Sequence, residues 1–222
     1  MERKYYEAYD DRYRQVHEKG LQWFDSAPSA IVEEVLREFR ISGKMLELGC
    51  GEGRDAHFLL GRGYDLTATD LSPAAIEFCR KSDSAHGDCY RVLDCVRGKL
   101  DETFDFIYAV AVVHMLVEDG DRAGFYGFLR EHLTDSGVAL VCSMGDGVTE
   151  RNSDPKAAFD LQKRVHGPTG REVEIASTSY RAVSFETFRK EIEAAGLTVL
   201  KTGLTDIQPD YYSMMYAVVK KS

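Results

Sequence analysis

Residues 44–55 read KMLELGCGEGRD, and this stretch decides the fold. Residues 45–48 are typical of a short buried strand, and apolar residues return at helical spacing after residue 54. Between the two, glycine stands at the alternate positions 49, 51 and 53. Glycine lets the backbone approach a ligand where a Cβ would collide. The stretch therefore predicts the strand, turn and helix that open a nucleotide-type α/β fold.

Carboxylates stand at the ends of neighbouring candidate strands. Asp70 and Asp94 each close a short strand, and Glu47 lies inside the first one. Arg54 occupies the place of the third glycine of a G-x-G-x-x-G dinucleotide fingerprint. Three carboxylates would repel a pyrophosphate, but they suit a ligand with hydroxyls, an amino group and a sulfonium. S-adenosylmethionine (SAM) is such a ligand.

The segments LELGCGEG (46–53) and TDLS (69–72) resemble the first two motifs of the class I SAM-dependent methyltransferases. LDC (93–95) and FDFIYAVAVVHML (104–116) extend this resemblance, which runs from about residue 40 onward. It implies an α/β, Rossmann-like, doubly wound sheet of seven strands. The sheet would be mostly parallel with a C-terminal antiparallel strand and helices on both faces. A Rossmann-like domain for another nucleotide is the alternative.

The resemblance also implies SAM as cofactor and S-adenosyl-L-homocysteine (SAH) as product. Glu47 is expected at the methionine end, Asp70 at the ribose hydroxyls, and Asp94 with Cys95 beside the adenine. The expected cofactor-binding residues are Glu47, Gly49, Cys50, Gly51, Asp55, Asp70, Leu71, Asp94, Cys95, Val110 and Ala111. No metal site is expected.

Composition narrows the class of protein. A chain of 222 residues, 44% hydrophobic, fits one domain with an insertion. Its net charge of -9 argues against phosphate-neutralising contact with nucleic acid and favours a small-molecule acceptor. Five cysteines without a C-x-x-C pair predict a reducing, cytoplasmic location. No apolar run is long enough for a membrane span, and we expect a monomer or homodimer.

We divide the chain into four parts from the pattern of its sequence. They are an N-terminal helical lid or cap (1–43), a SAM-binding core (44–143), a substrate-recognition insert (144–183) and a C-terminal helix with an antiparallel hairpin (184–222). A helix predicted over residues 2–25 places Tyr5, Tyr9, Tyr13 and His17 on one face. It either packs on the core or forms a lid over cofactor and substrate. YDDRY (9–13) loosely resembles the opening of thiopurine-type methyltransferases.

The insert is polar and rich in glycine and proline. A short helix is predicted for residues 155–165 and an extended hairpin arm for residues 171–183. Its basic residues include Arg151, Lys163, Arg164, His166, Arg171 and Arg181. The insert is either a solvated loop or a site that reads a carboxylate or another anion. Tyr9, Tyr13, His166 and Arg171 are the candidate substrate-binding residues.

Helix-capping residues and apolar runs predict the remaining helices and strands. Ser72-Pro73 and Ser184 should open helices, and Asp121 should cap a helix that ends at Leu133. Further predicted elements are a helix over 29–39 and strands over 104–111, 137–143, 197–203 and 212–220.

Methyl transfer from a sulfonium is an in-line displacement, so the protein mainly aligns the nucleophile. A base is needed only for a protonated acceptor, and His114, Tyr13 and His17 are the catalytic candidates, with His166 as a further base. His114 either packs a helix start or lines the substrate pocket. AVAV at 109–112, in place of N/D-P-P-Y, weighs against methylation of nucleic-acid bases.

VVHML (112–116) and LVCSM (140–144) are similar to tellurite-resistance methyltransferases. The leading prediction is transfer of a methyl group to an N, O or S nucleophile of a small molecule. Two alternatives stay open: a methyltransferase of tRNA or protein, and a SAM-binding protein with a different outcome.

Overall fold

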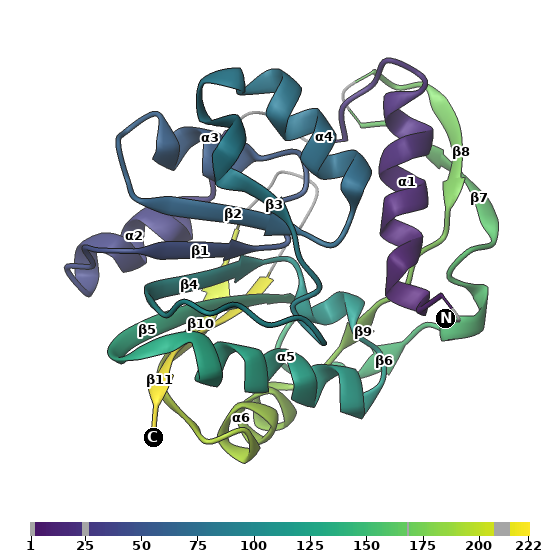
Figure 1. The fold of residues 1–222 in the computed structure, drawn as a ribbon. Coiled ribbons are helices and arrows are strands. Elements are labelled where there is room, and N and C mark those ends of the chain that lie inside the picture. Colours follow the sequence, from purple (N-terminus) through teal and green to yellow (C-terminus); the bar gives the residue numbers. More distant parts are fainter. Residues whose placement is uncertain (1–2, 24–26, 168, 207–213) are drawn as a thin grey trace.

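A seven-stranded sheet forms the centre of the molecule, with helices on both faces (Figure 1). The computed structural model describes residues 3–23, 27–167, 169–206 and 214–222. The strands of this sheet are β1 (Met45–Leu48), β2 (Leu66–Asp70), β3 (Tyr90–Val92), β4 (Phe104–Val110), β5 (Leu133–Met144), β10 (Leu197–Thr205) and β11 (Met214–Lys221). Their order is β10-β11-β5-β4-β1-β2-β3, and only β11 runs antiparallel to its neighbours. The predicted fold class is confirmed.

Two layers of helices cover the sheet. The α-helices are α1 (Ala8–His17), α2 (Ala30–Glu38), α3 (Arg54–Leu60), α4 (Pro73–Ser82), α5 (Asp119–His132) and α6 (Phe185–Ala194). The 3-10 turns are η1 (Tyr5–Glu7), η2 (Ser84–Cys89), η3 (Val113–Met115) and η4 (Pro155–Ala157). Helices α2, α3 and α4 pack on one face, and α5 and α6 pack on the other (Figure 1).

The pleat of the central strands divides the core into these two layers. Along β4, Phe106 and Tyr108 pack toward α2–α4, whereas Ile107 and Ala109 pack toward α5 and α6. Successive side chains of a strand point to opposite faces, so a strand buried on both sides must be apolar throughout. The same alternation turns Glu47 of β1 toward the α2–α4 layer, beside Tyr108 in the β1–β4 register.

The predicted helix caps hold at two of three positions. The Ser72 hydroxyl accepts the Ala75 N–H at 3.1 Å, and the Ser184 hydroxyl accepts the Thr187 N–H at 3.2 Å. The prediction that Asp121 caps a helix is wrong, because α5 already begins at Asp119.

The insert forms two small antiparallel pairs. They are β6 (Arg151–Asn152) with β9 (Arg181–Ala182), and β7 (Leu161–Val165) with β8 (Glu172–Ala176). Residues 172–176 and 181–182 are extended as predicted, but the predicted hairpin within 171–183 is wrong, because β8 pairs with β7 and β9 pairs with β6. The predicted helix over 155–165 is wrong beyond the turn at Pro155–Ala157, because residues 161–165 find a strand partner in β8.

Helix α1 lies along this insert, near the carboxyl ends of the parallel strands (Figure 1). Arg12 donates to the Ala176 carbonyl at 2.9 Å and to the Ser177 carbonyl at 2.7 Å. The Gln15 amide oxygen accepts the Ala176 N–H at 2.7 Å. The helix predicted for residues 2–25 ends at His17, and part of that range lies outside the described residues.

The terminal hairpin pairs β10 with β11, as predicted, although residues 212–213 lie outside the described residues. β10 is an edge strand of the sheet, and its ladder is irregular between Val199 and Lys201. The intervening Leu200 is 41% exposed.

Candidate active site

Three glycines in left-handed conformation shape the turn after β1. Gly49, Gly51 and Gly53 have φ angles of +70°, +55° and +80°. A Cβ at position 51 would lie 2.5 Å from the Tyr13 hydroxyl, and one at position 53 would lie 2.9 Å from the Cys79 sulfur. Only glycine fits this turn, because both the backbone angles and the close neighbours exclude a side chain.

Glu47 brings an unpaired carboxylate oxygen to the same place. The residue is 3% exposed, and its Oε2 is buried without a hydrogen-bond partner among the described residues. Burial, and then the nearby Asp55 carboxylate, raise the pKa of Glu47 well above its ordinary value. A cationic ligand group beside Glu47 would favour the ionised carboxylate.

Asp55 has a different environment, although it is equally buried. Its two oxygens accept the Ser29 N–H at 2.6 Å and the Ser29 hydroxyl at 2.8 Å. The guanidinium of Arg54 lies 3.4 Å from the same carboxylate. Asp55 therefore joins the start of α2 to the start of α3.

Asp70 and Asp94 hold the loops that follow β2 and β3. Asp70 accepts the backbone N–H groups of Gly51 and Ser72, each at 2.8 Å. Burial raises the pKa of Asp70 to about 6, although these two bonds oppose the shift. Asp94 accepts the Val96 N–H at 2.8 Å and lies 3.4 Å from the Tyr6 hydroxyl.

A cavity of about 540 Å³ opens at the carboxyl ends of β1 and β4, between the glycine turn, α1 and the insert. Predicted site residues that line it are Tyr9, Tyr13, Glu47, Gly49, Cys50, Gly51, Asp55, Val110, Ala111, His114 and His166. Predicted site residues outside its lining are His17, Asp70, Leu71, Asp94, Cys95 and Arg171. Four of these six, at 70, 71, 94 and 95, lie at the ends of β2 and β3.

The start of α1 lies close to those strand ends. The Asp10 carboxylate accepts the Ser72 hydroxyl at 2.6 Å and the Ala74 N–H at 3.2 Å. Tyr6 reaches Asp94 in the next loop. The cavity thus contains the residues expected at the methionine end. At the expected adenosine end, Tyr6 of η1 contacts Asp94, and Asp10 of α1 binds the start of α4 just after Asp70 and Leu71.

The three candidate bases have unlike surroundings. His114 is 3% exposed, and burial, followed by the Arg122 charge, lowers its pKa to about 3. Burial, followed by the Asp70 charge, raises the pKa of Tyr13 well above its ordinary value. His17 binds the Glu52 carboxylate at 2.9 Å and stacks on Phe78 with ring centroids 4.5 Å apart.

Residues 46–139 match the protein family described as "Methyltransferase domain". This part of the chain is therefore similar to a methyltransferase domain. The resemblance drawn from the sequence is confirmed at this level.

Two curated relatives match less than half of the chain. The chain is 34% identical over 108 residues to "Hemagglutinin 1" of Eikenella corrodens, an alignment that covers 46% of this chain and 35% of the relative. It is 28% identical over 100 residues to "Probable S-adenosyl-L-methionine-dependent methyltransferase TehB" of Haemophilus influenzae, covering 44% and 35%. The matched part is thus about a third of the length of each relative.

A solved structure shares the fold over the full length of the chain. It is the Burkholderia thailandensis 1,6-didemethyltoxoflavin-N1-methyltransferase with bound 1,6-didemethyltoxoflavin and S-adenosylhomocysteine. The TM-score is 0.71 at 15% identity, and the alignment covers 100% of this chain and 92% of that one.

Several residues of the cavity wall were not among the site residues predicted individually from the sequence. They are Arg12, Trp23, Glu52, Arg54, Met115, Met144, Arg164, Val165, Gly167, Ser177, Thr178, Ser179, Tyr180 and Met214. Trp23 is the sole tryptophan of the chain, which is a signal that could have found it. The segment 177–180 has no motif, and only its packing against α1 and η3 brings it to the site.

His166 and Arg171 differ in position. His166 is 2% exposed, with Nδ1 2.7 Å from the Thr169 hydroxyl and Nε2 against the Gln22 carbonyl. It therefore joins the insert to the segment after α1 while it lines the cavity. Arg171 is exposed outside the cavity.

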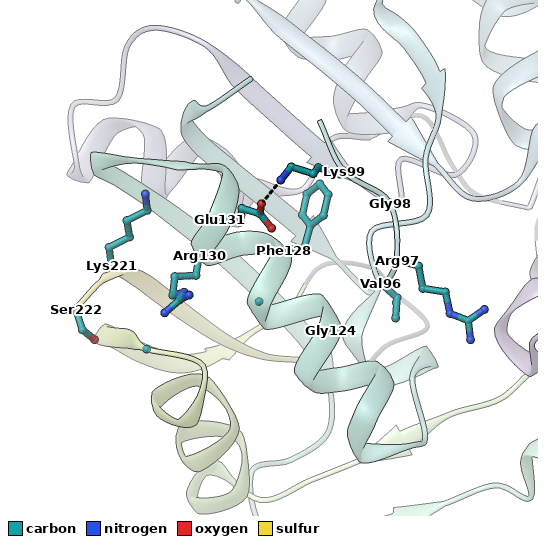
Figure 2. A pocket seen from close by; sticks show the side chains of 12 residues that line it. Val96, Arg97, Gly98, Lys99, Gly124, Phe128, Arg130, Glu131, Lys221 and Ser222 are labelled. Carbon is teal, nitrogen blue, oxygen red and sulfur yellow. Dashed lines mark ion pairs between the residues drawn. The ribbon is translucent and has the colours of Figure 1, made fainter. Parts of the chain in front are cut away.

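A larger groove of about 1010 Å³ lies elsewhere, along α5 (Figure 2). Its wall includes Lys99, Glu131 and Lys221, and Lys99 pairs with Glu131 at 2.8 Å. No residue of the glycine turn lines this groove. We therefore place the candidate site at the smaller cavity, which collects the buried carboxylates and the glycines.

Among the described residues, no group of three His, Cys, Asp or Glu side chains is arranged to hold a metal ion. Within the same residues, every helix is too short or too polar to cross a membrane.

Proposed function

We propose that this protein transfers the methyl group of SAM to an N, O or S nucleophile of a small-molecule acceptor. The observation that carries the proposal is the buried, unpartnered Oε2 of Glu47 beside the left-handed glycine turn. A buried carboxylate without a donor is costly, and a ligand that brings an ammonium group removes that cost. SAM carries an ammonium group and a sulfonium, so it fits this acidic end of the cavity.

We assign the remaining cofactor contacts by position. The backbone at Gly49 and Gly51 would lie against the cofactor, and Asp70 would accept the ribose hydroxyls. Each Asp70 oxygen accepts one N–H bond and keeps a lone pair for a second donor. Asp94 and Cys95 would lie beside the adenine.

A bound SAM would supply an electrophilic methyl group. The protein would contribute alignment of the acceptor and exclusion of water by α1 and the insert. His114 is a poor base, because its pKa of about 3 keeps it neutral at physiological pH. Its Nδ1 lies 3.5 Å from the Met144 N–H, so Nε2 would carry the hydrogen and donate to the acceptor. We therefore expect an acceptor that is nucleophilic without removal of a proton by His114.

The dimensions and charge of the protein favour a small acceptor. A cavity of about 540 Å³ falls within the roughly 300–1,000 Å³ of small-molecule sites. The net charge of -9 disfavours RNA. The Burkholderia structural neighbour, by its description, is an N1-methyltransferase of a small molecule.

Isothermal calorimetry of the purified protein with SAH, NAD and ATP tests the proposal. We expect saturable binding of SAH alone, followed by release of SAH from SAM when a broad panel of small acceptors is supplied. Binding of NAD or ATP in place of SAH would refute the cofactor assignment. A gel shift with bulk tRNA would show retardation if the acceptor were instead RNA.

A further inference from the structure

We propose that the acceptor is a planar aromatic compound that carries a carboxylate. This inference rests on the proposed function and concerns the aromatic and basic residues of the cavity wall. Three observations carry it: the distribution of charge along the wall, the aromatic and thioether side chains there, and the position of Arg12.

The two ends of the cavity differ in charge. The wall carboxylates Glu47, Glu52 and Asp55 all lie in or beside the glycine turn, where the one arginine, Arg54, lies 3.4 Å from the Asp55 carboxylate. The insert contributes Arg164, a side chain of β7 that makes no ion pair or hydrogen bond within the part of the chain that the structure describes. An acceptor bound between these ends would direct an anionic group toward Arg164. Arginine binds a carboxylate through two parallel hydrogen bonds, which also fixes its plane.

The cavity wall also suits a flat ring. Tyr9, Trp23 and Tyr180 line it and are half-buried, and the Trp23 backbone N–H donates to the Glu52 carboxylate at 2.8 Å. Met115 and Met144 add polarisable thioethers to the same wall. Aromatic rings stack or meet edge to face with aromatic ligands, and methionine adapts to their outline.

Arg12 excludes the opposite choice, a cationic acceptor held by the aromatic rings. Its guanidinium lies 5.3 Å from the centre of the Tyr9 ring and 5.5 Å from that of Trp23. A second cation stacked on these rings would be repelled by this charge. A neutral ring with an anionic substituent meets no such repulsion.

Trp23 provides the readout, because its emission is the only tryptophan signal of the chain. The SAH-saturated protein is titrated with 4-hydroxybenzoate, 6-hydroxy-2-naphthoate, 4-hydroxybenzamide and 4-hydroxybenzylamine, with free N-acetyltryptophanamide as an optical control. We expect saturable quenching by the acids, with dissociation constants about tenfold lower than that of the amide. The amine should not bind.

Arg164→Gln should raise the dissociation constants of the acids to that of the amide. Lys163→Gln is the matched control, because Lys163 is the adjacent β7 residue, lies outside the cavity lining and pairs with Glu172 at 2.8 Å. It should leave the constants unchanged.

Three results would overturn the inference: no saturable quenching by either acid, equal affinity for acid and amide, or equal effects of the two substitutions. Calorimetry with SAH on the same preparation separates the two proposals. Protein that binds SAH but not the acids refutes the acceptor class alone, whereas protein that does not bind SAH refutes the proposed cofactor.

Discussion

Glu47 and Asp70 are two buried carboxylates beside the glycine turn, and they differ in the hydrogen bonds that they accept. Glu47 keeps an oxygen without a donor, whereas both Asp70 oxygens accept backbone N–H groups. Burial raises the pKa of both, to about 6 for Asp70. The protonation of each side chain therefore depends on which ligand groups come near it.

Glu47 should release a proton when SAH binds. The raised pKa favours the protonated acid in the free protein, and the ligand ammonium would favour the carboxylate. Calorimetry at neutral pH in buffers of different ionisation enthalpy measures this release. Glu47→Gln should abolish it, and 5′-methylthioadenosine, which lacks the amino-acid part, should show none. Equal release by the variant would contradict the role of Glu47.

The raised pKa of Asp70 predicts that both the stability of the protein and its affinity for SAH depend on pH. Because its folded pKa lies above the unfolded value of 3.8, its contribution to stability is present below that value and is lost as pH rises through about 6. Ribose hydroxyls need the ionised form, so SAH affinity should fall as pH drops below about 6, by at most about tenfold per pH unit. Calorimetry between pH 5 and 8 checks this. In Asp70→Asn the affinity should be lower and this dependence should disappear, and an identical profile in the variant would exclude the ribose assignment.

Among the elements, η3 is held by a buried arginine of α5. Arg122 is 1% exposed and donates to the carbonyls of Val113 at 2.7 Å and Leu116 at 3.2 Å. Its guanidinium also pairs with Glu191 of α6, with Nε to Oε1 at 2.8 Å. This cation therefore fixes the segment that carries His114 against both helices of one layer.

Arg122→Leu should lower the free energy of unfolding by about 3–5 kcal/mol, because it removes the cation closest to the largely buried Glu191 carboxylate and the guanidinium that binds the carbonyls of Val113 and Leu116. Glu191 would keep only the longer contacts to Arg181 at 3.8 Å and Tyr126 at 3.4 Å among the described residues. Urea denaturation measures the loss. Arg189→Leu is the control, since Arg189 pairs with Glu193 on the exposed side of α6 and contributes little. The NMR titration of His114 should also show a higher pKa in Arg122→Leu, because the Arg122 charge lowers it. Equal stability of the two variants would contradict the role of Arg122.

The sequence predicted the central elements better than the insert. β4 and β5 are recognisable because strands buried on both faces are apolar runs, and the glycine turn is set by local backbone angles. Residues 161–165 have no such local signal. They are a strand because β8, seven or more residues further along the chain, pairs with them. Pairing at a distance overrides local preference, so the helix predicted there was wrong.

The same reason limited the prediction of the site. Cofactor-side residues could be named from motif positions, and many of them line the cavity. Trp23 and the 177–180 segment reach it only because α1 packs on the insert, which no local pattern reveals. His17 was predicted from its place on the α1 face. In the structure, the His17 side chain contacts Glu52 and does not line the cavity.

Taken together, the parts of the chain before and after the core meet over the cavity. Helix α1 and the insert, more than 150 residues apart, are joined by Arg12, Gln15 and Tyr9. The site is therefore enclosed by two segments that depend on each other and not on the sheet alone.

Arg12→Met should loosen both segments together, because it removes the donors to Ala176 and Ser177 while it keeps the apolar stem. Hydrogen exchange measured by mass spectrometry should show faster exchange in residues 8–17 and 172–179, with the sheet unchanged. Arg14→Met is the control, since the ion pairs of Arg14 among the described residues are with Asp10 and Asp11 of its own helix. Faster exchange confined to α1 would contradict the coupling.

The irregularity between Val199 and Lys201 in β10 bears on solubility. β10 is nine residues long and exposes Leu200 and Leu204. A regular edge strand with these apolar side chains could pair with a strand of another molecule. The irregularity breaks the even spacing of the N–H and C=O groups along the outer edge of β10, and Lys201 beside it forms an ion pair with Glu38 at 2.6 Å. The molecule thereby carries its own protection against strand-to-strand aggregation at high concentration.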